Sequence, residues 1–165
     1  MAKIGVFFGS STGNTEDAAK QIAEALGVEA TEISSASDDE VIGCDYIVFG
    51  LSTWGAGDVQ DDFDDFMDTL ESMDFSGKKV AIFGLGDQES YPDTFVDGMG
   101  IVGRAVKAAG GELVGAVATD GYEYDASEAE EGGKFIGLPL DEDNQSDQSA
   151  GRIAAWVAEL KKSFT

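Results

Sequence analysis

The sequence KIGVFFGSSTGNT, residues 3–15, joins a short apolar run to a loop of glycines and hydroxyl side chains. An unbroken apolar run of this length is typical of a strand buried on both faces. Similar runs recur at three places: DYIVFG (45–50), KVAIFG (79–84) and ELVGAVA (112–118). The run VEATEI (28–33) alternates instead and is typical of an edge strand. These five runs predict the strands of one sheet.

Apolar stripes with helical spacing lie between and after these strands. They comprise Ala18, Ala19, Ile22, Ala23 and Leu26; Phe63, Phe66, Met67, Leu70 and Met73; Met99, Val102, Val106 and Ala109; and Ile153, Trp156, Val157, Leu160 and Phe164. Alternating strands and helices predict parallel pairing through right-handed crossovers. We therefore expect a three-layer α/β/α, doubly wound fold, with residues 1–165 as a single domain. Ligands of such folds bind beyond the carboxyl ends of the strands, so the loops at 9–15, 50–58 and 84–93 are expected to meet there.

Composition excludes several classes of chemistry. A single cysteine, Cys44, excludes an internal disulfide and a cysteine-based metal cluster, and the lack of histidine excludes Ser-His-Asp catalysis. A bound cofactor is then expected to supply any redox chemistry. No apolar run reaches the roughly 18–20 residues that cross a bilayer, and the apolar start lacks a signal-peptide cleavage site, so we expect a cytoplasmic protein.

The charge balance is strongly acidic, with 33 Asp and Glu against 10 Lys and Arg and a net charge of -23. Such a surface repels nucleic acid and anionic membranes and attracts basic partners. Solubility or salt tolerance is an equally simple interpretation, and composition does not separate the two.

The loop at 9–15 is rich in neutral hydrogen-bond donors and contains no Lys or Arg. It opens a helix, whose unpaired N–H groups and dipole bind anions. It matches neither G-x-x-x-x-G-K-[ST] nor G-x-G-x-x-G. An ordinary helix cap needs only one or two such donors. A phosphate monoester fits neutral donors, whereas a triphosphate requires Mg²⁺ and a lysine, so we expect a mononucleotide-like cofactor.

Two aromatic residues lie in the neighbouring loops. Trp54 is in STWGAGD (52–58), and Tyr91 is in GDQESYPDTF (86–95). Either residue alone could anchor its loop. Together, at one edge of the sheet, they favour a site in which two aromatic rings enclose a flat ring.

Four motifs together make the chain similar to the long-chain flavodoxins over its whole length: GSSTGNT (9–15), STWGAGD (52–58), GLGDQESYPDTF (84–95) and LDEDNQSD (140–147). The resemblance implies a five-stranded sheet of order 2-1-3-4-5. It also implies that an insertion at about 120–139 interrupts the fifth strand. The implied cofactor is non-covalent FMN.

The resemblance also assigns roles by position. The ribityl phosphate would be held by Ser10, Ser11, Thr12, Gly13, Asn14 and Thr15. Trp54 and Tyr91 would stack on opposite faces of the isoalloxazine, and its polar edge would meet backbone groups around Gly55, Gly57, Gly86, Asp87 and Gln88. Ser52 and Thr53 would line the approach of the ribityl chain, and Asp143 would bond a ribityl hydroxyl. The chain departs from the family pattern at Gly55 and Leu85, which bears on redox tuning.

The function implied by the resemblance is low-potential, one-electron transfer by a monomer without a substrate of its own, cycling between neutral semiquinone and anionic hydroquinone. Implied partners are basic-surfaced redox proteins, such as ferredoxin–NADP reductase, photosystem I or nitrogenase reductase. Carboxylates crowd the ring-side loops and should disfavour added negative charge: Asp58, Asp61, Asp62, Asp87, Glu89 and Asp93. The Gly55–Ala56 peptide is expected to flip readily and to stabilise the semiquinone, because glycine tolerates positive φ.

A flavin-dependent quinone reductase of related fold is the alternative. Two aromatics covering both ring faces argue against it, because such an enzyme binds its substrate over an open face. A signalling receiver is excluded because Asp45 opens the third strand instead of ending it.

Overall fold

The computed structural model describes residues 3–9, 13–54, 58–59 and 61–164, with only the backbone described at residues 54, 58 and 59. Its helices are α1 (Asn14–Leu26), the 3-10 turn η1 (Ile33–Ser35), α2 (Asp38–Ile42), α3 (Asp61–Ser72), α4 (Asp97–Ala108) and α5 (Ser146–Ser163). Its strands are β1 (Ile4–Phe8), β2 (Ala30–Glu32), β3 (Tyr46–Trp54), β4 (Asp58–Val59), β5 (Lys79–Leu85), β6 (Glu112–Leu113), β7 (Val117–Ala118), β8 (Glu130–Glu131), β9 (Lys134–Phe135) and β10 (Leu138–Leu140).

The main sheet is parallel and confirms the predicted order. Its strands follow the order β2-β1-β3-β5-β10, and β6 pairs with the start of β5 while β10 pairs with its end. The strands β6 and β10 therefore form one interrupted fifth strand, and the strand order is 2-1-3-4-5. The short β4 pairs antiparallel with the end of β3.

The interruption runs from residue 114 to residue 137, so it starts earlier and ends slightly earlier than the predicted 120–139. The prediction that ELVGAVA (112–118) is one strand is wrong, because the parallel pairing with β5 ends near Leu113 and β7 pairs antiparallel with β9. Gly115 has φ 85, a left-handed conformation that breaks an extended strand. Within the insertion, β7, β9 and β8 form a small separate sheet.

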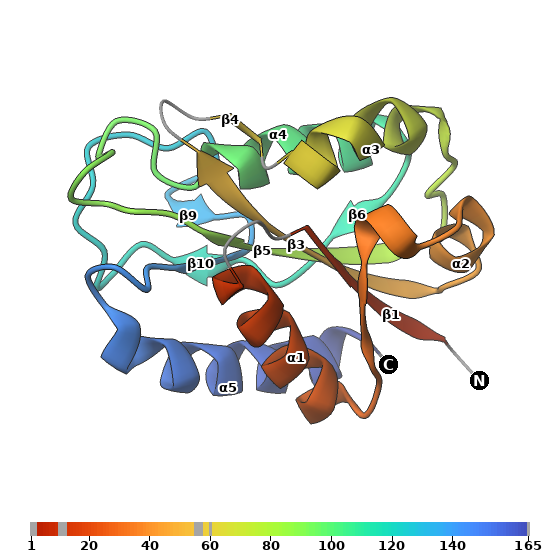
Figure 1. Cartoon of the computed structure of the whole chain (residues 1–165), viewed down its shortest axis with the longest axis horizontal. Coiled ribbons are helices and arrows are strands. Elements are labelled where there is room, and N and C mark those ends of the chain that lie inside the picture. Colours follow the sequence, from red (N-terminus) through yellow and green to blue (C-terminus); the bar gives the residue numbers. More distant parts are fainter. Residues whose placement is uncertain (1–2, 10–12, 55–57, 60, 165) are drawn as a thin grey trace.

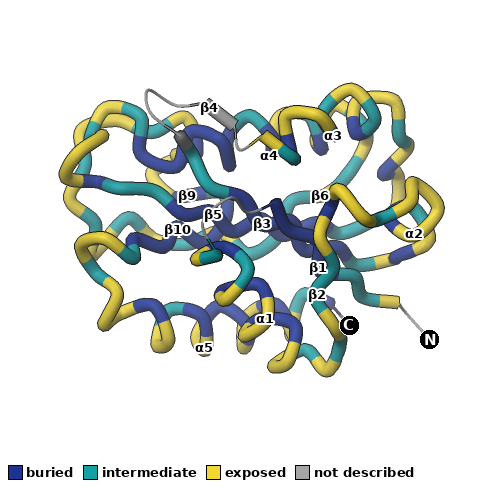
Figure 2. The backbone as a smooth tube through the Cα atoms, in the orientation of Figure 1, coloured by how far each residue is buried: buried dark blue, intermediate teal, exposed yellow. Residues whose placement is uncertain are grey.

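The three predicted layers are present. In Figure 1, α3 and α4 cover one face of the sheet, and α1 and α5 cover the other. Successive residues of the strands point to opposite faces, so Phe49 packs in the core beside α3 and α4, whereas Val48 packs in the core beside α1 and α5. Figure 2 shows this arrangement as buried strands between helices that are exposed on their outer sides. The prediction of strands buried on both faces is confirmed.

The third strand is longer than the predicted 45–50. Ser52 still pairs with Leu85 of β5, and Thr53 pairs with β4, so these two residues lie in the strand and not in a loop. The short helix α2 was not predicted; Ser37 caps it by accepting a hydrogen bond from the Glu40 N–H at 3.2 Å. Among the described helices, none is long and apolar enough to cross a membrane.

Candidate functional site

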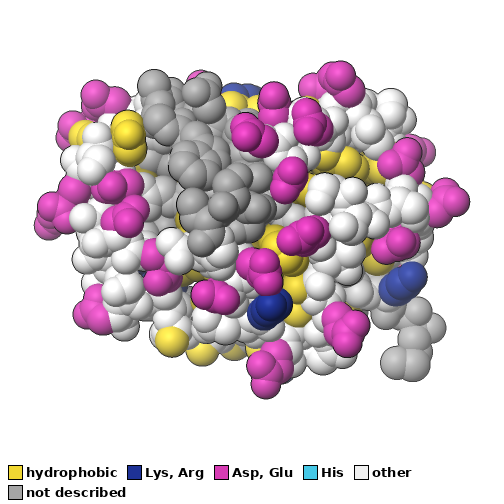
Figure 3. Space-filling view, viewed as in Figure 1, with side chains coloured by type: hydrophobic (Ala, Val, Ile, Leu, Met, Phe, Trp, Pro, Cys, Tyr) yellow, Lys and Arg dark blue, Asp and Glu magenta, His cyan; other side chains and the backbone are white. Residues whose placement is uncertain are grey.

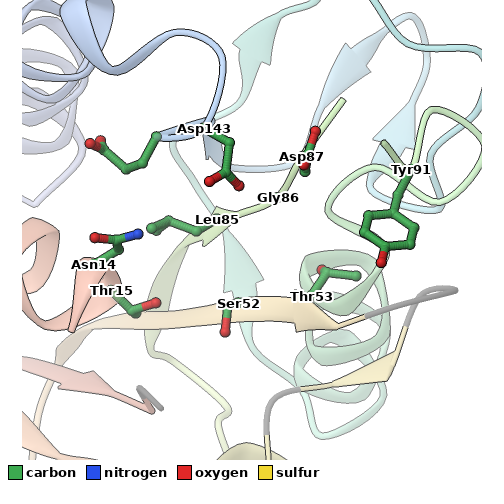
Figure 4. A pocket seen from close by; sticks show the side chains of 10 residues that line it. Asn14, Thr15, Ser52, Thr53, Leu85, Gly86, Asp87, Tyr91 and Asp143 are labelled. Atoms are coloured by element: carbon green, nitrogen blue, oxygen red, sulfur yellow. The ribbon is translucent and has the colours of Figure 1, made fainter. Parts of the chain in front are cut away.

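A cavity of about 260 Å³ opens at the carboxyl ends of β3 and β5, next to the start of α1. Its lining residues are Asn14, Thr15, Ser52, Thr53, Leu85, Gly86, Asp87, Tyr91, Glu142 and Asp143. In Figure 4, Asn14 and Thr15 lie on one side of this space and Tyr91 on the other, with Ser52 and Thr53 between them. The structure thus brings together residues from all the motifs that the sequence singled out. Two of the lining residues, Leu85 and Glu142, were not among the predicted cofactor-binding residues.

The α1 side of the cavity is built by a glycine in a left-handed conformation. Gly13 precedes the helix with φ 92 and offers no side chain to cap the first turn. The Gly9 N–H donates to the Gly50 carbonyl at 2.9 Å, which anchors the start of the loop to β3. The helix therefore directs the N–H groups of its first turn toward the cavity end where Asn14 and Thr15 lie. The predicted donors Ser10, Ser11 and Thr12 lie outside the described residues.

The β3 side of the cavity is fixed by a contact with α4. The Gly98 N–H, in the first turn of α4, donates to Thr53 Oγ1 at 2.9 Å. Trp54 ends β3, and its side chain, like Gly55 and Gly57, lies outside the described residues.

Tyr91 forms the far side of the cavity. It is the one exposed large hydrophobic side chain among the residues that the structure describes, with 47% of its surface accessible. Its loop is held by hydrogen bonds: Asp87 Oδ1 accepts from the N–H groups of Glu89 and Ser90 at 3.1 and 2.9 Å. The Tyr91 N–H donates to the Asp87 carbonyl at 2.9 Å. A hydrogen-bonded loop that leaves its aromatic residue half exposed is suited to stacking on a flat ligand.

Behind this loop lies a buried carboxylate, Asp141, with 0% exposure. Its oxygens accept hydrogen bonds from the N–H and side-chain amide of Gln88 at 3.0 and 2.9 Å and from the N–H and side-chain amide of Asn144. The Asn144 amide also donates to Asp87 Oδ1 at 2.8 Å, which ties the loop after β10 to the loop after β5. Gln88 is itself 3% exposed and does not line the cavity, although we expected its backbone to face the ligand.

Two carboxylates on the cavity wall have shifted pKa values. Burial raises the pKa of Asp87, but hydrogen bonds from Ser90, Asn144 and Glu89 outweigh burial and hold the pKa below its ordinary value. The pKa of Asp143 is raised by burial and by the neighbouring charges of Asp87, Asp141 and Glu142. These carboxylates therefore repel any further negative charge that is placed in the cavity.

The lining combines a helix start, neutral hydroxyl and amide groups, an exposed tyrosine and the three carboxylates of Asp87, Glu142 and Asp143. All ten Lys and Arg residues are in the described part of the chain, and none lines the cavity. A phosphate monoester can bind the helix start and a flat ring can stack on Tyr91, so the residues fit a phosphorylated aromatic cofactor. The fold and site define a doubly wound protein that binds such a cofactor beyond the carboxyl ends of its strands.

The comparisons with known proteins identify the family. A family model for flavodoxin matches residues 6–156. The chain is 44% identical to a flavodoxin of Picosynechococcus over 168 residues, and 44% identical to a flavodoxin of Helicobacter pylori over 165 residues, covering 99% of both chains in each comparison. A flavodoxin of Fusobacterium nucleatum, crystallised with flavin mononucleotide, superimposes with a TM-score of 0.94 at 31% identity and covers 100% of both chains. The chain belongs to the flavodoxin family, whose members are electron-transfer proteins rather than enzymes.

Proposed function

We propose that the cavity binds FMN non-covalently and that the chain is a low-potential, one-electron carrier for basic redox proteins. The observation that carries this proposal is the placement of a half-exposed Tyr91 across the cavity from the first turn of α1, with Ser52 and Thr53 between them. The FMN-bound flavodoxin of F. nucleatum, similar over its full length, supports the same ligand. Bound FMN would supply the one-electron chemistry between a neutral semiquinone and an anionic hydroquinone.

The proposed roles of the individual residues are those that the resemblance to the flavodoxins implies. We propose that Ser10 to Thr15 hold the phosphate and that Trp54 and Tyr91 stack on the ring. Ser52, Thr53 and Asp143 would line the ribityl chain, and backbone groups around Gly55, Gly57, Gly86 and Asp87 would meet the polar ring edge. The cavity lining supports this assignment for the members that the structure describes.

The carboxylates that line the cavity determine whether the site raises or lowers the redox potential of its cofactor. Asp87, Glu142 and Asp143 line the cavity, and the buried Asp141 lies behind it. An added negative charge in the cavity meets their repulsion without a lining cation to offset it. Each 1.4 kcal/mol of such repulsion lowers a one-electron potential by about 59 mV. The site therefore favours a low potential for the electron that makes its cofactor anionic.

The acidic surface supports the proposed partners. Figure 3 shows Asp and Glu side chains spread over the face in view, with few Lys or Arg side chains among them. The start of α3 alone carries Asp61, Asp62 and Asp64. Redox proteins with basic surfaces, of the ferredoxin–NADP reductase, photosystem I or nitrogenase reductase type, would dock there weakly and quickly.

We also propose that the protein is a monomer and that it is located in the cytoplasm.

Titration of the flavin-free protein with FMN tests the proposal. Binding should quench flavin fluorescence with one FMN per chain, and riboflavin, which lacks the phosphate, should bind more weakly. Reductive titration of the complex should then pass through a blue species. Failure to bind FMN would overturn the assignment, and binding without the blue species would overturn the proposed redox couple.

The dependence of the electron-transfer rate on ionic strength tests the proposed partners. A rate that does not change with ionic strength would exclude docking of basic partners on the acidic surface.

A further inference from the structure

The insertion at residues 114–137 runs alongside the loop that carries Asp87 and Tyr91; both lie at the same end of the molecule (Figure 1). The Pro92 carbonyl accepts hydrogen bonds from the N–H groups of Asp125 and Ala126 at 2.7 and 2.9 Å. Five residues further along, Asp97 Oδ1 accepts a hydrogen bond from the Glu128 N–H at 2.8 Å. The insertion therefore runs beside the chain that follows Tyr91 and is hydrogen-bonded to it at successive positions.

Gln88 makes the first of these contacts and also reaches a third segment. Its side-chain carbonyl accepts a hydrogen bond from the Glu123 N–H of the insertion at 2.5 Å. Its side-chain amide donates to Asp141, after β10, at 2.9 Å, and its own N–H donates to the same carboxylate at 3.0 Å. The two hydrogen bonds to Asp141 are buried, because Gln88 is 3% exposed and Asp141 is 0% exposed, whereas the bond from Glu123 is part-buried.

The geometry has a consequence for the cavity. Gln88 directly follows Asp87, a lining residue, and lies three positions before Tyr91. We propose that Gln88 is a positioning residue: by joining the insertion and Asp141 to the loop after β5, it holds Tyr91 in the orientation that stacks on the ligand. Binding then needs no reordering of that loop, which lowers its entropic cost. This inference rests on the proposed binding of FMN.

The test compares Gln88→Leu with wild type in flavin titrations. Leucine has a similar size but makes no side-chain hydrogen bond, so the side-chain bonds to Glu123 and Asp141 are lost and only the backbone N–H bond to Asp141 remains. We expect the Kd for FMN to rise about tenfold, equivalent to about 1.4 kcal/mol. The Kd for riboflavin should rise by the same factor, because the loss falls on the ring side of the cavity. A general loosening of the fold would also weaken binding of the phosphate, which only FMN has. The Kd for FMN would then rise by a larger factor than the Kd for riboflavin, and the ratio of the riboflavin Kd to the FMN Kd would fall.

Trp156→Phe is the matched control. Trp156 is 3% exposed, and its indole N–H donates to the Gly115 carbonyl at 2.7 Å, linking α5 to the start of the insertion away from the Tyr91 loop. This variant and Gln88→Leu should both lose stability to urea, but Trp156→Phe should keep the wild-type Kd for FMN under conditions where both proteins are folded.

A double-mutant cycle with Tyr91→Ala tests whether Gln88 acts through the tyrosine. In the Tyr91→Ala background, Gln88→Leu should change the Kd by much less than tenfold. Additive effects of the two substitutions, or a wild-type Kd for Gln88→Leu, would overturn the inference. If wild type binds FMN in the same experiment, the proposed function stands in either case; if wild type does not bind, the proposed function itself fails.

Discussion

Replacing Thr53 with valine should destabilise the protein by removing a helix cap that comes from a distant strand. The N-cap position of α4 is Val96, which has φ 47 and makes no side-chain cap hydrogen bond. The hydroxyl of Thr53, 45 residues earlier in the chain, accepts the Gly98 N–H at 2.9 Å instead. Valine keeps the branched shape of threonine but leaves this buried N–H without its acceptor.

The expected magnitude follows from the loss of that one hydrogen bond. Losing a Ser or Thr cap costs about 0.5–2 kcal/mol, and leaving a buried N–H unpaired costs about 1–3 kcal/mol. Since Thr53 borders the cavity, where water can reach, we expect a loss of about 1–2 kcal/mol. For a chain of this size, that lowers Tm by about 2–8 °C.

Urea unfolding of the flavin-free protein measures the effect. The midpoint should fall with an unchanged m value, because the surface exposed on unfolding stays the same. Thr53→Ser is the control, since it keeps the hydroxyl and should retain most of the stability. If Thr53→Val unfolds at the same urea concentration as wild type, the hydroxyl does not cap α4 and the reasoning is wrong.

Three further predictions concern the cavity and the surface charge. Tyr91→Ala should raise the Kd for FMN by about 10-fold or more, because an aromatic pair contributes about 0.5–1.5 kcal/mol beyond its buried area; the urea midpoint of the flavin-free protein should barely move, since the ring is half exposed. Asp143→Asn should stabilise the flavin-free protein at neutral pH, because a raised folded-state pKa means that folding penalises the ionised carboxylate. That gain should shrink as pH falls from the raised pKa toward 3.8, and a gain that stays constant with pH would contradict the assignment. Finally, the urea midpoint of wild type should rise between 0.05 and 1 M KCl, because salt screens the repulsion within a chain of net charge -23; a midpoint that falls would show that attractive pairs dominate.

The sequence by itself determined the layered fold and the place of the site. Apolar runs such as DYIVFG (45–50) have no polar face, so they fit only strands covered on both sides, and the alternation with helical stripes requires parallel crossovers. Parallel strands bring the loops after β1, β3 and β5 to one edge. Eight of the cavity-lining residues were named in advance, but several of them, including Ser52, Thr53 and Asp143, only through the resemblance to the flavodoxins.

Short elements were not predictable in this way. The strands β8 and β9 have two residues each, which is too few for any periodicity, and they exist because the insertion folds back on itself. The end of the regular fifth strand depends on the left-handed conformation of Gly115, and a glycine in the sequence does not reveal its φ.

The tertiary structure alone decided the hydrogen-bond partners that hold the site. The sequence suggested a role only for the backbone of Gln88 and did not reveal that its side chain is buried against Asp141, 53 residues away. Nor did it reveal that Thr53 caps a helix that begins 44 residues later. A polar side chain next to a glycine-rich loop carries the same sequence signal whether it bonds a ligand, water or another segment. Only the packing of the three segments around Gln88 selects among these partners, because burial makes each unpaired polar group costly and leaves few arrangements in which all of them are satisfied.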